Sequence, residues 1–123
     1  MKNSIRFSGN ADYGYSASRG GTTVNVKRDG VFWVASYGGI PLLHNPIKPT
    51  ADGRVTISCS CPTIVVGNGF TKRKDAAEAA LDVKCKEWSN WRLAYDQVKE
   101  AEPDALGSTT LKRARVRYAE IVA

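Results

Sequence analysis

The sequence predicts an α+β fold, in which an antiparallel β-sheet of three to five strands is followed by one long helix packed on it and by a second, C-terminal helix. Two runs of alternating apolar and polar residues on either side of Asp29-Gly30 predict the centre of the sheet. Apolar residues recur at the helical period over residues 71–102 and again over residues 108–122. Strands therefore precede helices along the chain, an order that is typical of the α+β class.

Residues 1–70 are predicted to be mostly β. Residues 4–7 alternate and predict a short strand, whereas residues 9–21 have no clear period and receive no assignment. Tyr13 and Tyr15 in this stretch offer either packed rings or stacking faces. Of these two fates we favour packing, because a tyrosine ring is largely apolar.

The Asp-Gly pair at residues 29–30 predicts a two-residue hairpin turn of type I′, because glycine accepts positive φ and aspartate tolerates it. Such a turn places Val26 opposite Trp33. One face of the hairpin is predicted to pack on the long helix, and it carries Val24, Val26, Val31, Trp33 and Ala35. The other face carries Thr23, Asn25, Lys27, Phe32, Val34 and Ser36. On this second face, Phe32 beside Lys27 forms a candidate contact surface.

The stretch between the hairpin and the long helix begins with a long connection. Residues 38–53 contain three prolines, and a loop of this length in a small domain is usually functional or mobile. Residues 54–61 alternate again and predict a strand, and residues 63–66 predict another. The Gly-Asn-Gly sequence at residues 67–69 then predicts the turn into the helix.

The long helix is predicted over residues 71–102, with Thr71 as its N-cap and Pro103 as its stop. Its buried face is expected to carry Ala77, Ala80, Leu81, Cys85, Trp88, Trp91, Tyr95 and Val98. At 1.5 Å per residue this helix is about 40 Å long, whereas ordinary strands span roughly 17–20 Å. The second half of the helix therefore needs a partner other than the sheet.

The partner of that second half is expected to be the C-terminal helix or a second copy of the chain in a homodimer. The C-terminal helix is predicted over residues 108–122, with Ser108 as its N-cap. Its apolar face carries Leu111, Ala114, Tyr118, Ile121 and Val122. The short turn from Pro103 to Gly107 suits an antiparallel pair of helices.

Length and composition bound the class of protein. A chain of 123 residues has the size of one domain, so we expect residues 1–123 to form a single domain. The N-terminal residues contain no apolar run and no later segment is long enough to span a bilayer, so we expect a cytoplasmic protein without a membrane segment. Three cysteines fit a reducing compartment better than a disulfide framework.

Positive charge is the main indication of a partner. The net charge is +6 and the pI is about 9.4. Two basic clusters stand out, one of Lys72, Arg73 and Lys74 and one of Lys112, Arg113, Arg115 and Arg117. They are either nucleic-acid contacts or solvated faces that keep the protein soluble.

Catalytic and metal-binding patterns are weak. The chain has one histidine, His44, and neither a Gly-x-Ser-x-Gly motif nor a phosphate loop, so we expect no enzyme, no catalytic residues and no cofactor. His44 together with Cys59, Cys61 and Cys85 offers one nitrogen and three sulfurs to zinc. The Cys-x-Cys spacing is not the usual Cys-x-x-Cys, so we expect no metal site.

Three cations at the start of a helix oppose the helix dipole, and a bound phosphate would relieve that conflict. Residues 65–81 resemble the last strand and final helix of the double-stranded RNA-binding domain, whose helix opens with a Lys-Lys-x-Ala-Lys pattern followed by paired alanines. Arg73, Lys74 and Ala76 match that pattern, and Ala77 stands where the family has its third lysine.

The resemblance spans residues 31–88 at its widest. Residues 39–44 are similar to the loop that such domains place in the RNA minor groove, which implies an RNA contact for His44. The family's first helix has no counterpart here, since residues 4–7 predict a strand. The resemblance implies shape-based recognition of duplex RNA through the start of the long helix.

Two functions therefore follow from the sequence. The first is a small non-enzymatic protein that contacts the phosphate backbone of duplex RNA or DNA. Its expected contact residues are Lys72, Arg73, Lys74, Lys112, Arg113, Arg117 and His44. The alternative is a protein-binding adaptor or inhibitor that docks on a host or partner enzyme complex.

Overall fold

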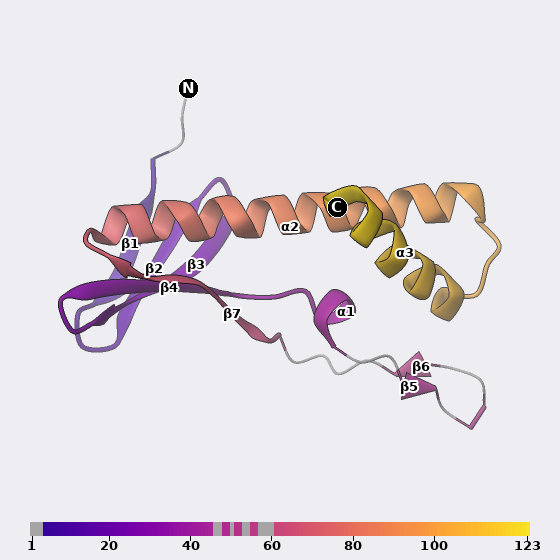
Figure 1. The fold of residues 1–123 in the computed structure, drawn as a ribbon, viewed down its shortest axis with the longest axis horizontal. Helices are drawn as coiled ribbons and strands as arrows, with labels where there is room; N and C mark the ends of the chain where they lie inside the picture. Colours follow the sequence, from indigo (N-terminus) through magenta and orange to yellow (C-terminus); the bar gives the residue numbers. More distant parts are fainter. Residues whose placement is uncertain (1–3, 46–47, 50, 53–54, 57–60) are drawn as a thin grey trace. The chain divides into compact units, whose positions relative to one another are not determined.

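A computed structural model describes residues 4–45, 48–49, 51–52, 55–56 and 61–123 (Figure 1). The elements in chain order are β1 (Arg6–Asn10), β2 (Gly14–Arg19), β3 (Thr22–Asp29), β4 (Phe32–Gly38), α1 (Pro41–His44), β5 (Lys48–Pro49), β6 (Val55–Thr56), β7 (Thr63–Phe70), α2 (Arg73–Ala101) and α3 (Gly107–Val122). The predicted α+β fold is confirmed, because a five-stranded antiparallel sheet is followed by a long helix and a C-terminal helix.

Contacts between residues divide the chain into two units, which we describe separately. The sheet unit comprises Met1–Gly39 and Thr63–Lys86, and the helical unit comprises Ile40–Pro62 and Glu87–Ala123. Helix α2 contributes residues to both units. The expectation of a single domain over the whole chain stays a prediction.

The sheet unit is built on a meander of antiparallel strands in the order β1-β2-β3-β4-β7. Strand β2 falls in the stretch that the sequence left unassigned, and it pairs Ala17 with Phe7 on one side and with Val24 on the other. The core beneath the sheet consists of Ala17, Val24, Val26, Ala35 and Tyr37 from the strands and Ala76, Ala77, Ala80 and Leu81 from α2. Alanines at the contact let the helix approach the strands closely, so both elements exclude water from the same core.

The β3–β4 hairpin has a different register from the predicted one. Val26 pairs with Ala35 and not with Trp33, and the turn residues are Gly30 and Val31. Gly30 has a φ of 64°, and no non-glycine residue among those described has a positive φ. Glycine therefore takes the first central position, as in a type II′ turn, and no side chain is strained. The shift is two residues, so the alternation of faces is preserved, but Val31 is exposed at the turn.

Strand β7 runs through the Gly-Asn-Gly sequence that was predicted to be a turn. Its pairing with β4 shifts register on both sides of Ala35, which lies opposite Gly67. Gly69 has a φ of 95°. The two glycines thus accommodate an irregularity inside the strand, a role that glycine often has in sheets.

Helix α2 begins at Arg73, two residues after the start predicted at residue 71. The amide of Ala76 donates to the carbonyl oxygen of Lys72 at 3.2 Å, so Lys72 and not Thr71 occupies the N-cap position. The helix ends at Ala101, close to the predicted stop before Pro103.

The buried line along α2 differs from the predicted one after its third turn. Cys85 and Trp88 are exposed, whereas Glu87 and Ala94 are buried. Two polar residues, Lys84 and Glu87, lie along this buried line, and the charged group of each has a hydrogen-bond partner. Lys84 Nζ donates to the Thr23 carbonyl oxygen at 2.7 Å, and the Glu87 carboxylate accepts hydrogen bonds within the helical unit.

The helical unit confirms that the C-terminal helix covers the second half of the long helix. Its core contains Ile40, Trp91 and Ala114, packed against Leu42, Leu43, Tyr95, Val98, Leu111 and Tyr118. Helix α3 begins at Gly107 with Leu106 as its N-cap, so the prediction of Ser108 as the N-cap was wrong. The Thr110 amide donates the first intrahelical hydrogen bond to the Leu106 carbonyl oxygen, and the Thr110 hydroxyl donates to the same oxygen.

The long connection carries regular structure of its own. It contains the short helix α1, and β5 pairs with β6 through Lys48 opposite Thr56. Of the strand predicted over residues 54–61, residues 55 and 56 form β6 and the remainder lies almost entirely outside the described residues. Among the helices that the structure describes, none combines the length and the apolar character that crossing a membrane requires.

Tyr118 gives the helical unit a testable response to alkaline pH. Burial, and after it the negative charge of Glu87, raises the pKa of the Tyr118 hydroxyl above its ordinary value of 10.0. The folded protein therefore holds this proton more tightly than the unfolded chain. The contribution of the Tyr118 hydroxyl to the free energy of unfolding is complete below pH 10 and is lost as the pH rises through the folded-state pKa. We expect the melting temperature to fall above about pH 10, and Tyr118→Phe to reduce that fall.

Thermal melts of both proteins followed by circular dichroism, from about pH 9 to about pH 11, test this expectation. Comparing the two proteins isolates Tyr118 from the other groups that titrate in this range. Identical pH profiles for the two proteins would contradict it.

Candidate nucleic-acid interface

The three cations at the start of α2 have different surroundings. Arg73 is half-buried, and its guanidinium carbon lies 4.1 Å from the ring centroid of Phe7 and 4.5 Å from that of Tyr15. These cation–π contacts join the start of the helix to β1 and β2. Lys72 and Lys74 are exposed, and their side chains have no ion pair or hydrogen bond to any other described residue. Two of the three predicted contact residues are thus available to a ligand.

The C-terminal cations belong to the helical unit, and most of them have partners there. Arg113 pairs with Glu102. Arg117 Nε donates to Gln97 Oε1 at 2.7 Å, and Arg115 donates to the Asn45 carbonyl oxygen at 2.7 Å. Lys112 is exposed and has no such contact within the described part of the chain. This cluster is therefore largely occupied with contacts inside its own unit.

His44 lies at the end of α1, where Nε2 is 3.0 Å from Glu87 Oε1. The same oxygen accepts a hydrogen bond from the Ile40 amide at 3.3 Å. Glu87 is 9 % exposed, so these contacts hold a buried carboxylate against α1. The surroundings of His44 favour a structural role. Of the residues considered for zinc, Cys61 and Cys85 are exposed free thiols in different units, and Cys59 lies outside the described residues.

The net positive charge is concentrated in the sheet unit. Its segments contain ten Lys and Arg against five Asp and Glu, a net charge of +5. The segments of the helical unit contain eight against seven, a net charge of +1. The composition of the sequence gives only the total net charge of +6, because the segments of the two units alternate along the chain.

One face of the sheet packs on α2 and the opposite face carries small polar side chains. A row of paired residues crosses all five strands on that face, from Ser8 through Ser16, Asn25 and Ser36 to Val65. A neighbouring pair, Ser18 and Thr23, is joined by a hydrogen bond of 3.0 Å between its hydroxyls. Arg6 and Lys27 add two cations to this face. We call it the open face of the sheet, because Ser8, Asn25 and Val65 on it are exposed.

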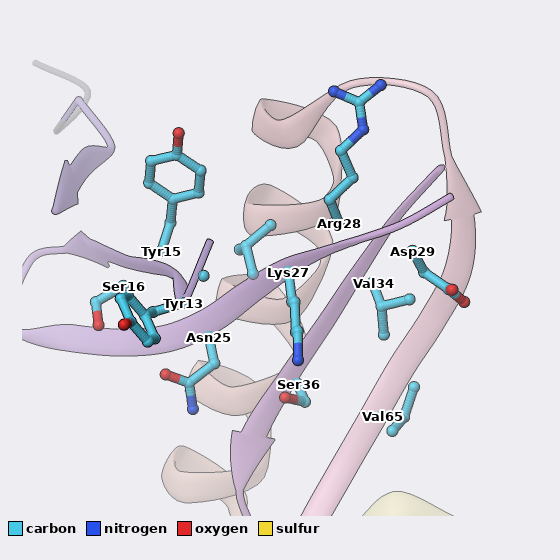
Figure 2. A pocket seen from close by; sticks show the side chains of 12 residues that line it. Tyr13, Tyr15, Ser16, Asn25, Lys27, Arg28, Asp29, Val34, Ser36 and Val65 are labelled. Atoms are coloured by element: carbon cyan, nitrogen blue, oxygen red, sulfur yellow. The ribbon is translucent and has the colours of Figure 1, made fainter. Parts of the chain in front are cut away.

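A shallow depression of about 480 Å³ lies on the open face. Figure 2 shows Asn25, Lys27 and Ser36 on this side of the strands, whereas Tyr15 and Arg28 project from the other side. The residues that line the depression are Tyr13, Gly14, Tyr15, Ser16, Asn25, Val26, Lys27, Arg28, Asp29, Val34, Ser36 and Val65. The Lys27 side chain has no ion pair or hydrogen bond to other described residues, so its ammonium group is available at this depression.

Tyr13 stands at the rim of the depression in a turn that its neighbours order. Asn10 Oδ1 accepts hydrogen bonds from the amides of Asp12 and Tyr13, at 3.0 and 2.9 Å. The Tyr13 side chain is 88 % exposed. Tyr15, two residues further along the chain, instead packs against Phe7 and Trp33. The two tyrosines therefore have the two different fates that the sequence left open.

One end of the sheet gathers the candidate residues. Because the strands alternate in direction, the β1–β2 turn, the β3–β4 turn and the end of β7 lie at the same end. Tyr13 lies in the first of these turns, Phe32 directly follows the β3–β4 turn, and Lys72 lies close to the end of β7. Lys27 lies on β3, three residues before Gly30 of the β3–β4 turn. The sequence predicted a contact surface at Phe32 and Lys27 but had no means of adding Tyr13 and Lys72 to it.

Comparison of this chain with protein families, with characterised proteins and with solved structures finds no match.

Proposed function

We propose that this chain is a small non-enzymatic nucleic-acid-binding protein that docks through its sheet unit. The observation that carries the proposal is the net charge of +5 on this unit together with cations that lack partners within it. Those cations, among the residues that the structure describes, are Arg6, Lys27, Lys72, Lys74 and Lys86. Unpaired cations release condensed counterions when they meet phosphates, and this release is the main source of nucleic-acid affinity.

The contacts differ in part from those expected from the sequence. Lys72 and Lys74 stay in the proposed interface, whereas Arg73 acts by positioning the helix start on Phe7 and Tyr15. The resemblance to the double-stranded RNA-binding domain supports duplex RNA as one ligand of this helix start. Duplex binding in that manner stays a prediction.

The test is a mobility-shift series against duplex RNA, duplex DNA and single strands at several salt concentrations. Lys72→Ala combined with Lys74→Ala is expected to weaken binding and to reduce the slope of log K against log salt by about 2, since each lysine accounts for a slope of about 1. Lys112→Ala is the control, because Lys112 is also exposed but belongs to the helical unit. Absence of any shift at low salt, with all ligands, would refute the proposed function.

Protein binding is the second candidate function, and exposed apolar side chains on α2 favour it. Trp88 is 45 % exposed and Leu93 is 47 % exposed, and both belong to the helical unit. Large apolar side chains are frequent anchors of protein interfaces, including those of homodimers. A complex that is recovered by pull-down and withstands nuclease, or a homodimer in sedimentation, would support this function over the first.

A further inference from the structure

The open face of the sheet carries aromatic rings at the same end as Lys27, one of its two cations. Tyr13 is 88 % exposed in the β1–β2 turn, and Phe32, the first residue of β4 beside the β3–β4 turn, is 45 % exposed at the same end of the sheet. Lys27 lies between these turns on the middle strand. Exposed rings beside a cation form the combination that binds single-stranded nucleic acid, in which bases stack on rings and cations contact phosphates.

The floor of the depression is suited to a flat group. Gly14 has no side chain, and a Cβ there would lie 3.4 Å from the Val26 carbonyl oxygen and 3.7 Å from Lys27 Cβ, so a larger residue would fill the space beside Lys27. Ser16 and Ser36 flank Asn25 in the same row and are short. The Asn25 amide offers two donors and an acceptor, which match the edge of a base.

The charge of this face argues for a single strand over a duplex. Its paired rows contribute two cations, Arg6 and Lys27, and Asp29 at the turn is negative. The affinity of a protein that holds a duplex through its backbone rises with the number of phosphates that its cations neutralise. Two cations are too few for that mode, whereas stacking supplies much of the affinity for unpaired bases.

We infer that the open face of the sheet binds single-stranded nucleic acid, with Tyr13 and Phe32 stacking on bases, Lys27 and Arg6 contacting phosphates, and Asn25 contacting a base edge. This inference rests on the proposed function and goes further by naming the ligand form and a surface separate from Lys74. The aromatic residues, and not the basic cluster at the start of α2, then determine the preference for unpaired bases.

Fluorescence anisotropy with a labelled single-stranded RNA of mixed sequence, the matching DNA and both duplexes tests the inference. Tyr13→Ala is expected to weaken single-strand binding about 5- to 100-fold, and Tyr13→Phe to retain most of it, because the ring supplies the stacking. Lys27→Ala is expected to lower the salt slope by about 0.7. Trp88→Ala is the control, since it removes an exposed ring from the helical unit and leaves the open face unchanged.

The outcomes separate the inference from the function on which it rests. Duplexes bound as tightly as single strands would overturn the inference. So would single-strand binding that is insensitive to Tyr13→Ala and Lys27→Ala but weakened by Lys72→Ala with Lys74→Ala, and this result would leave the proposed function standing. No binding of any nucleic acid at low salt would overturn both. Melting curves of the Tyr13 and Lys27 variants that match the wild type show that the fold is intact.

Discussion

Trp91→Ala is expected to lower the free energy of unfolding by about 3–5 kcal/mol. The Trp91 side chain is 7 % exposed, and its ring centroid lies 6.4 Å from that of Tyr95 and 6.5 Å from that of Tyr118. Truncation removes the largest side chain from the core of the helical unit. It leaves a cavity between α2 and α3 that the rigid helices fill only in part.

Urea denaturation of the intact chain, followed by circular dichroism, measures this effect. Trp88→Ala is the matched control, because it makes the same chemical change on the same helix at a side chain that is 45 % exposed. We expect the control to cost less than about 1 kcal/mol. Equal costs for the two substitutions would show that Trp91 does not occupy the core as described.

This pair of tryptophans also shows what the sequence can predict of α2. The helical period and Pro103 predicted both ends of the helix to within two residues. The period did not predict which of Trp88 and Trp91 is buried, since both fit an apolar stripe. The choice depends on the polar residues Lys84 and Glu87, whose partners come from distant segments of the chain.

For the strands, too, some features were predictable from the sequence and others were not. The alternation of residues 22–37 predicted the hairpin and its two faces, because faces depend only on the period of two. The register was wrong by two residues, because the position of Gly30 in the turn decides it and an Asp-Gly pair fits more than one turn type. Strand β2 was missed, since its small residues have no apolar alternation and it is held by pairing with β1 and β3.

Which candidate residues are available to a ligand depends on tertiary contacts, and these cannot be deduced from the sequence. Charge patterning found the cations, but it did not distinguish Arg73, which packs on two rings, from Lys72, whose side chain has no partner among the described residues. It likewise did not show that Arg113 pairs with Glu102. Phe32 beside Lys27 was predicted because both lie on one face of a local hairpin. Tyr13 joins them only through the topology of the sheet.

Glu87→Ala is expected to lower the free energy of unfolding by about 2–4 kcal/mol. Glu87 is 9 % exposed, and its Oε1 atom accepts hydrogen bonds from the Ile40 amide at 3.3 Å and lies 3.0 Å from His44 Nε2. Alanine would leave the buried Ile40 amide without this acceptor. It would also release α1 from α2, because these contacts join the two helices.

Urea denaturation of three variants separates the role of the carboxylate from general effects on the helix. Glu87→Gln keeps an acceptor oxygen and is expected to cost less than Glu87→Ala, while Glu78→Ala removes an exposed carboxylate from the same helix and is expected to cost less than about 0.5 kcal/mol. A double-mutant cycle with His44→Ala should give a coupling of about 0.5–3 kcal/mol, because the two side chains are in contact. If Glu87→Ala costs no more than Glu78→Ala, or if the coupling with His44 is zero, the carboxylate does not hold α1. His44 would then be free for the nucleic-acid contact that the sequence predicted, so the stability of these variants also decides between the two roles of this histidine.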